Sequence, residues 1–436
     1  MIYELLILVG ILLIVSVIAF GRDITAPAVL VNGSFFVATF CACLYADKWD
    51  FSEVKVIVVI VTGLSGFILF SYLCYFLETG WRRPPKCEFS PIVLSNMRLL
   101  VYLLVQLVII GGTFWVIKKN VGSLSSSIVA LGIKINEYYE LMHNDELIYS
   151  NKCIGLLQVI NFSGIYFMIY CAITNIIYKG KKQILVYINI LIGVIASLIT
   201  GTKTAFYMFM ISAFVVFMLL KQKQSGWKIK IRMKLLLKIM LLLVILLLSF
   251  GIINNLQGRV LDEYKATDVL ATYLGSPIKN LEIFIKENHV SSEVFGAQTF
   301  KYTYNDIYNY TKNARYLINN IDTYHWINSY PLGNVYTFFR APYYDFGIVG
   351  VFLLSGLAGA FSQKIYNIAK FEKKRNNLTI VYYSYVAFSI AFSFFSNKFF
   401  ESVLSKSSIY FILGFIIFEL FFIKISLKKG KITIKR

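Results

Sequence analysis

The chain has 436 residues, of which 58% are hydrophobic and only 15% charged, and its mean hydropathy is +0.67. This composition excludes a soluble domain and predicts a polytopic membrane protein. A net charge of +20 could suit nucleic acid, but the basic clusters KQKQSGWKIKIRMK and KFEKKRNN adjoin apolar stretches, where loops facing anionic lipid are basic. We expect contact with membrane lipids and none with nucleic acid.

Eleven apolar stretches are candidates for spanning helices, because roughly 20 apolar residues cross the hydrocarbon core. In chain order they are Ile2–Phe20, Ala26–Ala46, Val54–Phe76, Leu99–Ile117, Ile154–Tyr178, Ile184–Thr200, Thr204–Leu220, Leu235–Ile253, Pro342–Phe361, Leu378–Phe395 and Ile409–Ile425. The first has no basic region before it and no good cleavage site after it, which favours a spanning helix over a signal peptide. The expected fold is an all-α membrane bundle of about eleven helices.

The distribution of basic residues predicts the orientation, because short cytoplasmic loops retain positive charge. One set of alternate loops, together with the C-terminal tail, holds 26 of the 43 Lys and Arg residues. That set should be cytoplasmic, which puts the N-terminus outside and the C-terminus inside. Three segments follow: helices one to eight in residues 1–253, a large outer loop in 254–341, and three helices with a basic tail in 342–436.

The long loop spans 88 residues and contains 8 basic, 8 acidic and 16 aromatic residues. Its segment Ala266–Lys286 has apolar residues at helical spacing. This pattern predicts either a surface helix lying on lipid or a helical cap packed on the spans. Aromatic rings also suit sugars, whose apolar faces stack on them.

Where the loop re-enters the membrane, one arginine and one aspartate stand among aromatic residues in YPLGNVYTFFRAPYYDFGIVG. Arg340 can present a planar fork of donors that matches phosphate oxygens, or it can be an interfacial arginine held by lipid head groups. Asp345 follows Pro342 closely, so it can act chemically or simply favour the N-terminal end of its helix.

Other cations are expected on the same side of the membrane. The turn Gly201-Thr-Lys203 puts one lysine between two spans, where it is a ligand for an anion or an ordinary exposed residue. Arg259 and Arg315 lie in the long loop without a distinctive context. The cysteines and histidines lack metal-ligand spacing, so we expect no metal and no cofactor.

Three pieces of the chain resemble the bacterial oligosaccharide repeat-unit polymerases, the O-antigen polymerase family. They are YLGSPIKNLEIF at Tyr273–Phe284, VFGAQTF at Val294–Phe300, and the block from Asn334 to Gly347, which is the most specific. The number of spans and the large outer loop before a late helix are similar too. At the mid-chain turn the family commonly has arginine, whereas this chain has Lys203, which keeps the charge but loses the fork.

The resemblance implies glycosyl transfer at the outer face of the bacterial inner membrane. A growing glycan on undecaprenyl diphosphate would move onto a lipid-linked repeat unit, and a chain-length regulator is a further partner that the family allows. Arg340, Arg259, Arg315 and Lys203 are the candidates for binding the diphosphate, and Tyr336 and Tyr344 for binding sugar. His325 is the candidate base and Asp345 the alternative.

Two other functions share part of this pattern. A ligase that moves the finished glycan onto lipid A would have the same architecture and cations, although the Asn334–Gly347 block favours the polymerase. A flippase for lipid-linked oligosaccharide would instead need cations in the middle of the spans and no large outer loop.

Overall fold

A computed structural model describes residues 1–80, 82–124, 127–143, 146–228, 271–287, 294–328, 330–428 and 431–434. The helices of its first half are α1 (Ile2–Ala19), α2 (Pro27–Cys43), α3 (Ala46–Trp49), α4 (Lys55–Thr79), α5 (Asn96–Val121), α6 (Ile128–His143), α7 (Lys152–Ile177), α8 (Ile184–Leu198) and α9 (Thr204–Ser225). The second half contains α12 (Ser276–Lys286), α13 (Lys301–Thr311), η1 (Ala314–Tyr316), β1 (His325–Ile327), β2 (Tyr330–Gly333), α14 (Arg340–Phe371), α15 (Asn377–Ala391), η2 (Phe392–Phe394), η3 (Phe399–Val403), α16 (Lys406–Glu419), η4 (Leu420–Lys424), β3 (Ile425–Lys428) and β4 (Lys431–Ile434).

Eight helices in the described part of the chain are long and apolar enough to cross a membrane. They are α1, α4, α5, α7, α9, α14, α15 continued by η2, and α16 continued by η4. Two further apolar helices, α2 and α8, are shorter. The chain is thus a helical protein of the membrane type, and these ten helices coincide with ten of the eleven predicted stretches. The remaining stretch, Leu235–Ile253, lies outside the described residues.

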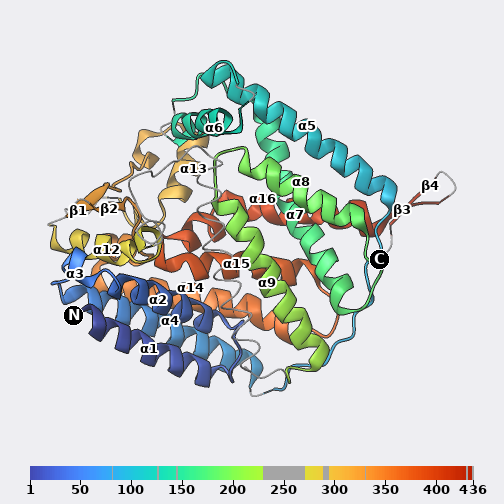
Figure 1. Ribbon diagram of the computed structural model, residues 1–436. Coiled ribbons are helices and arrows are strands. Elements are labelled where there is room, and N and C mark those ends of the chain that lie inside the picture. The colour runs from blue at the N-terminus through green and yellow to red at the C-terminus, as the bar shows by residue number, and fades with distance from the viewer. Residues whose placement is uncertain are drawn as a thin grey trace.

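The helices form two groups joined by α15 (Figure 1). Helices α1, α2, α4 and α14 pack together on one side, and α5, α7, α8, α9 and α16 on the other. Helix α15 contacts α2 and α14 in the first group and α7, α9 and α16 in the second. Its central position explains why most of its residues are buried although its sequence is no more apolar than that of its neighbours.

Helices α4 and α14 pack closely together, and glycine residues allow it. A methyl group added to Gly66 would lie 2.5 Å from the carbonyl oxygen of Phe352, and one added to Gly359 would lie 2.6 Å from that of Phe67. Small residues of this kind let helix backbones approach closely where apolar burial between helices supplies little drive. The packing fixes α14, which carries Arg340 at its first turn.

Helix α14 begins two residues before the predicted stretch. It also continues well beyond the predicted end, because a few polar residues do not end a helix whose buried face is intact. It is interrupted at Gly347, where φ is 62° and ψ is −155°. Glycine adopts this backbone conformation without the steric penalty that a side chain would bring. Arg340 and Asp345 therefore lie on a short helical piece that is set off from the long one.

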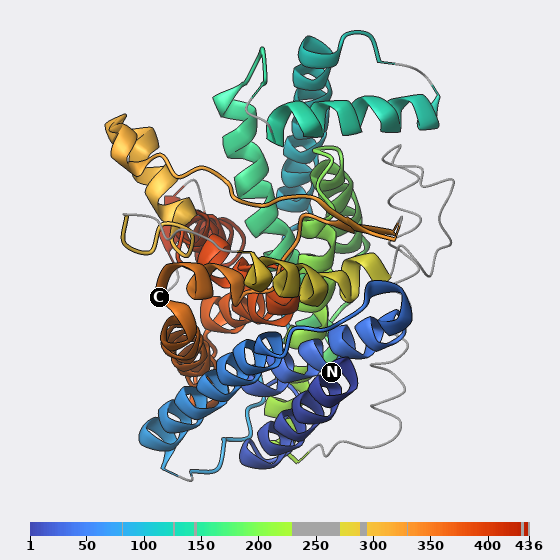
Figure 2. The same ribbon diagram turned by 90° about the vertical axis from the view of Figure 1, so that its left-hand side faces the viewer.

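Several non-spanning elements gather at one end of the bundle, which we call the hairpin end after its β1–β2 pair, whereas the pair β3–β4 lies elsewhere, next to the C-terminus (Figure 1). Helices α3, α12 and α13 and the antiparallel pair β1–β2 lie there, with α6 nearby (Figures 1 and 2). Helix α12 contacts α2, α4 and β2 and is mostly buried, with Ile278 and Leu281 fully so. Residues 271–274 of the predicted segment are helical as well, and a turn at Gly275, where a side chain would meet the backbone of Ala42, separates them from α12. Residues 266–270 of that prediction lie outside the described part of the chain.

Candidate functional site

Arg340 is the centre of a polar cluster at the hairpin end. It is the first residue of α14, and only 8% of it is exposed. Its Nη2 pairs with the carboxylate of Asp322, and its Nη1 donates to the carbonyl oxygen of Ile321 at 3.4 Å. The guanidinium carbon lies 4.4 Å from the ring centroid of Tyr336 and 5.3 Å from that of Phe284. Burial, a carboxylate and two rings therefore fix the orientation of the fork.

Asp345 has different partners from Arg340, although the sequence places the two five residues apart. Its carboxylate accepts hydrogen bonds from the backbone N–H groups of Gln298, at 3.2 Å, and Thr299, at 2.7 Å. These bonds attach the segment before α13 to the first piece of α14. The contacts make Asp345 a positioning residue in this structure, and Asp322 is the acid that meets Arg340.

The three segments that resemble the polymerase family contact one another beside this cluster. Asn280 of the first segment donates to the carbonyl oxygens of Val335 and Leu332, at 2.8 and 3.1 Å, at the start of the third segment. Phe295 of the second segment packs on Phe346 of the third, with ring centroids 4.9 Å apart. Segments separated by up to about sixty residues in sequence thus form one unit.

His325 lies on β1 beside the same cluster. Its Nε2 is 2.8 Å from the hydroxyl of Tyr336 and 2.9 Å from that of Thr323. Partial burial lowers the pKa of His325 below its ordinary value of 6.5, against the opposing effect of the Glu287 carboxylate. The imidazole is therefore neutral at pH 7 and able to accept a proton.

Tyr336 connects the histidine to the arginine. Its hydroxyl bonds with His325 and Thr323, while its ring stands beside the Arg340 guanidinium. Burial raises the pKa of Tyr336, although its bond with Thr323 and the charge of Arg340 act in the opposite direction. Tyr344 is half-buried and packs near Phe284, with ring centroids 6.1 Å apart.

The other predicted cations occupy different places. Lys203 is buried just before α9, with its amine 5.9 Å from the ring centroid of Tyr273, so it adjoins the first family-like segment. Arg315 is exposed on η1. Arg259 lies outside the described residues. The structure brings Arg340, His325 and Tyr336 together, and it shows no contact from Lys203 or Arg315 to that group within the described part of the chain.

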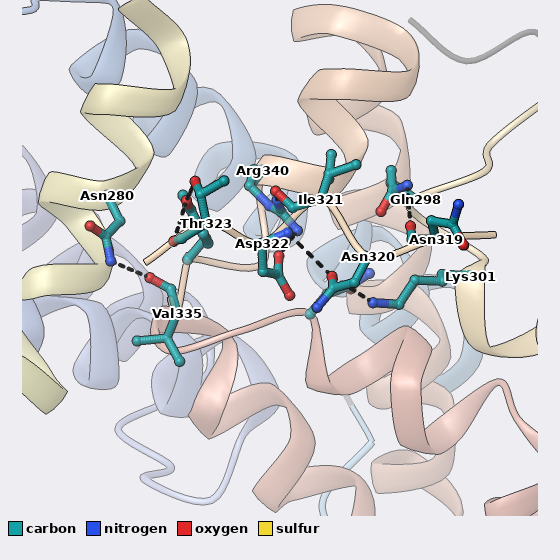
Figure 3. A network of polar contacts seen from close by, with 12 residues as sticks. Asn280, Gln298, Lys301, Asn319, Asn320, Ile321, Asp322, Thr323, Val335 and Arg340 are labelled. Carbon is teal, nitrogen blue, oxygen red and sulfur yellow. Dashed lines mark hydrogen bonds and ion pairs between the residues drawn. The ribbon is translucent and has the colours of Figure 1, made fainter. Parts of the chain in front are cut away.

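Four charged residues that the sequence did not single out complete the cluster. Lys301 donates to the Oδ1 of Asn320 at 2.9 Å, next to the segment that Arg340 holds (Figure 3). Burial lowers the pKa of Lys301, Asp322 and Glu401 act to raise it, and Arg340 and Lys398 act to lower it further. Lys398 itself pairs with Glu401 at 2.5 Å.

The cluster therefore contains three cations and two carboxylates, with one positive charge in excess. The sequence contains one indication that Lys301 belongs to the site, because this lysine directly follows the family-like segment VFGAQTF. Asp322, Lys398 and Glu401 stand in ordinary polar stretches and carry no such signal. Among the described residues no group of three or more His, Cys, Asp or Glu side chains could hold a metal ion. An anion held here would be bound by side-chain cations.

Comparisons with models of known protein families, with curated proteins and with solved structures found no match for this chain.

Proposed function

We propose that this protein is an oligosaccharide repeat-unit polymerase of the O-antigen polymerase type in the bacterial inner membrane. The observation that carries the proposal is that the three family-like segments contact one another, with Phe284 of the first against the buried guanidinium of Arg340 in the third. Aromatic rings and cations by themselves occur in many membrane proteins and do not indicate a particular function. The joining of these segments beside one arginine favours a common site.

In this proposal the hairpin end faces outward, the N-terminus lies outside and the C-terminus inside. Eleven spanning helices carry an outer helical cap that includes α12 and α13. Undecaprenyl-diphosphate-linked oligosaccharides are the substrates, and a chain-length regulator is a possible partner. O-antigen or a similar surface polysaccharide is the product.

The reaction breaks the bond between the sugar C1 of the donor glycan and its diphosphate oxygen, and forms a bond from C1 to an acceptor hydroxyl. Arg340, aided by Lys301 and Lys398, stabilises the negative charge that develops on the departing diphosphate. To reach the guanidinium, the diphosphate takes the place of the Asp322 carboxylate. Lys203, Arg259 and Arg315 remain further candidates for contacts to the diphosphate.

The acceptor hydroxyl gives its proton to the Nε2 of His325, whose position beside Tyr336 puts it next to the arginine. Tyr344 is the better candidate for stacking on sugar, because the ring of Tyr336 already stands against Arg340. Asp345 remains the alternative base only if it leaves the two backbone amides that it now accepts from.

Deleting the gene from its host tests the proposal directly. We expect surface glycan to run on a gel as a single repeat unit on its lipid anchor, with no ladder. Accumulation of long polymer on the carrier lipid would instead show a ligase, and single units left at the inner face would show a flippase.

The rate of polymerisation should fall in acid. Because the pKa of His325 is lowered, the neutral base predominates at pH 7, and activity is lost only as the pH falls through that lowered value. His325→Gln should reduce the rate by about 10²- to 10⁴-fold and remove this acid limb. The measurement is polymer formed from purified lipid-linked units at a series of pH values. Thr323→Val, which spares the imidazole, should keep the limb, and an unchanged profile in His325→Gln would assign the base elsewhere.

A further inference from the structure

A cavity of about 340 Å³ lies within the second helix group, apart from the Arg340 cluster. Its walls come from the first turns of α7, the end of α8, the start of α9, the middle of α15 and the turns around η3 and α16. These positions all fall in the half of the bundle nearer the hairpin end (Figure 1). The volume is within the range of roughly 300–1,000 Å³ in which small molecules bind.

The lining is uncharged and mixes polar with apolar groups, and most of its exposed surface is apolar. Serine, threonine, tyrosine, asparagine and glutamine make up more than half of the lining residues, and none of the described lining residues is ionised at neutral pH. Half-buried Ser402 and exposed Ser407 both line the cavity, and their hydroxyls make no hydrogen bond with another residue in the described part of the chain. Polar groups at membrane depth are costly and mark places that take water or a polar ligand. A phosphate group would need a cation to balance its charge, and this lining contains none.

Aromatic rings form another part of the wall. Tyr385 and Phe411 both line the cavity, but they are almost completely buried and their rings stack on each other with centroids 4.5 Å apart. Phe162 lines it from α7. Hydroxyl groups combined with ring faces are the complement of a sugar, whose C–H faces are apolar and whose edges carry hydroxyls.

Cations stand just outside this neutral space. Thr202 lines the cavity, and the next residue, Lys203, reaches the ring of Tyr273. Ser402 lines it too, and the preceding residue, Glu401, pairs with Lys398 of the charged cluster. Two lining residues are therefore next in sequence to Lys203 and to the partner of Lys398, while the lining itself contains no cation.

We propose that this cavity is a binding site for a neutral sugar ring. Its natural ligand, which rests on the proposed function, is a sugar of the lipid-linked glycan, with the diphosphate left at the cations outside. This assigns a recognition site for the glycan that is separate from the Arg340 cluster.

The test uses the full chain in phosphatidylcholine nanodiscs, since sugar-based detergents would compete. Neutral methyl glycosides of common hexoses and N-acetylhexosamines are offered as probes, and binding is followed by saturation-transfer NMR. We expect at least one of them to receive saturation. Ser402→Ala combined with Ser407→Ala should weaken that binding by roughly tenfold, through the loss of two hydrogen bonds.

A matched pair of glycines supplies the decisive comparison. A Cβ atom added at Gly155, which lines the cavity on α7, or at Gly111 on α5, which does not, would have no atom within 4 Å. Replacing either glycine should favour the helix rather than disturb it. Gly155→Phe should abolish sugar binding, and Gly111→Phe should retain it.

Two results would overturn the assignment: no probe receives saturation from the wild-type chain, or Gly155→Phe binds as the wild type does. The outcome is separate from that of the polymerase proposal. If the protein binds sugar but its deletion leaves the glycan ladder intact, the polymerase proposal is wrong and the sugar site stands. If deletion abolishes the ladder but the protein binds no sugar, the polymerase proposal stands and the sugar site is wrong.

Discussion

The Arg340→Ala variant is expected to make no glycan ladder, although it reaches the membrane in normal amount. The guanidinium is buried and fixed by Asp322, Tyr336 and Phe284, so it is organised before any substrate arrives. Losing one preorganised donor to a developing oxyanion costs about 10²- to 10³-fold in rate. The measurements are surface glycan on a gel and protein in the membrane fraction. Lys312→Gln, an exposed cation at the end of α13, serves as the control.

A purely structural role for Arg340 predicts a different pattern, and Asp322 distinguishes the two. If the arginine only neutralises Asp322, then Asp322→Ala should be as harmful as Arg340→Ala, and the double variant should recover. If the arginine binds diphosphate, Asp322→Ala should keep the ladder because it removes the internal competitor, and the double variant should remain inactive. A restored glycan ladder in the double variant would show that Arg340 does not bind the diphosphate.

Arg340→Lys should also be impaired. Lysine keeps the charge but presents it as a point, so it loses the paired donors that match two phosphate oxygens. It also loses the planar face that lies against Tyr336 and Phe284. Full activity in this variant would show that charge alone suffices.

The helices of the bundle could be predicted from sequence because a lipid-facing helix must be apolar over its whole length. The same rule explains why the end of α14 and the whole of α6 were not predicted. Helix α14 overruns its predicted end, since Gln363, Asn367 and Lys370 face other helices and not lipid, so their polarity does not stop it. Helix α6 was not predicted, because it is too polar to read as a span and lies beside the end of α5.

The candidate site could be predicted only in part. Arg340 and His325 stood out because a charge or a titratable ring near a membrane boundary is unusual. Their partners did not, since Asp322, Lys301 and Lys398 come from separate segments whose meeting depends on tertiary packing. The acid closest in sequence, Asp345, proved to hold backbone amides instead.

Another buried charge pair lies at the opposite end of the bundle from β1–β2. Asp23, between α1 and α2, pairs with Lys370 near the end of α14 at 2.6 Å, and both are almost completely buried. The same carboxylate accepts from the indole N–H of Trp227 at 3.0 Å and from Thr25 at 2.8 Å. One acid therefore ties the loop after α1 and the segment after α9 to the end of α14.

Breaking this pair should be strongly destabilising. Lys370→Met keeps the apolar stem but leaves Asp23 buried and unpaired, which costs about 3–5 kcal/mol. Lys364→Met is the matched control, because Lys364 lies on the same helix but is exposed, and it should change stability little. Both are compared by thermal unfolding of purified protein. Combining Lys370→Met with Asp23→Asn should recover much of the loss, since no uncompensated charge remains. Equal stability of the two lysine variants would mean that Asp23 is satisfied by its neutral donors alone.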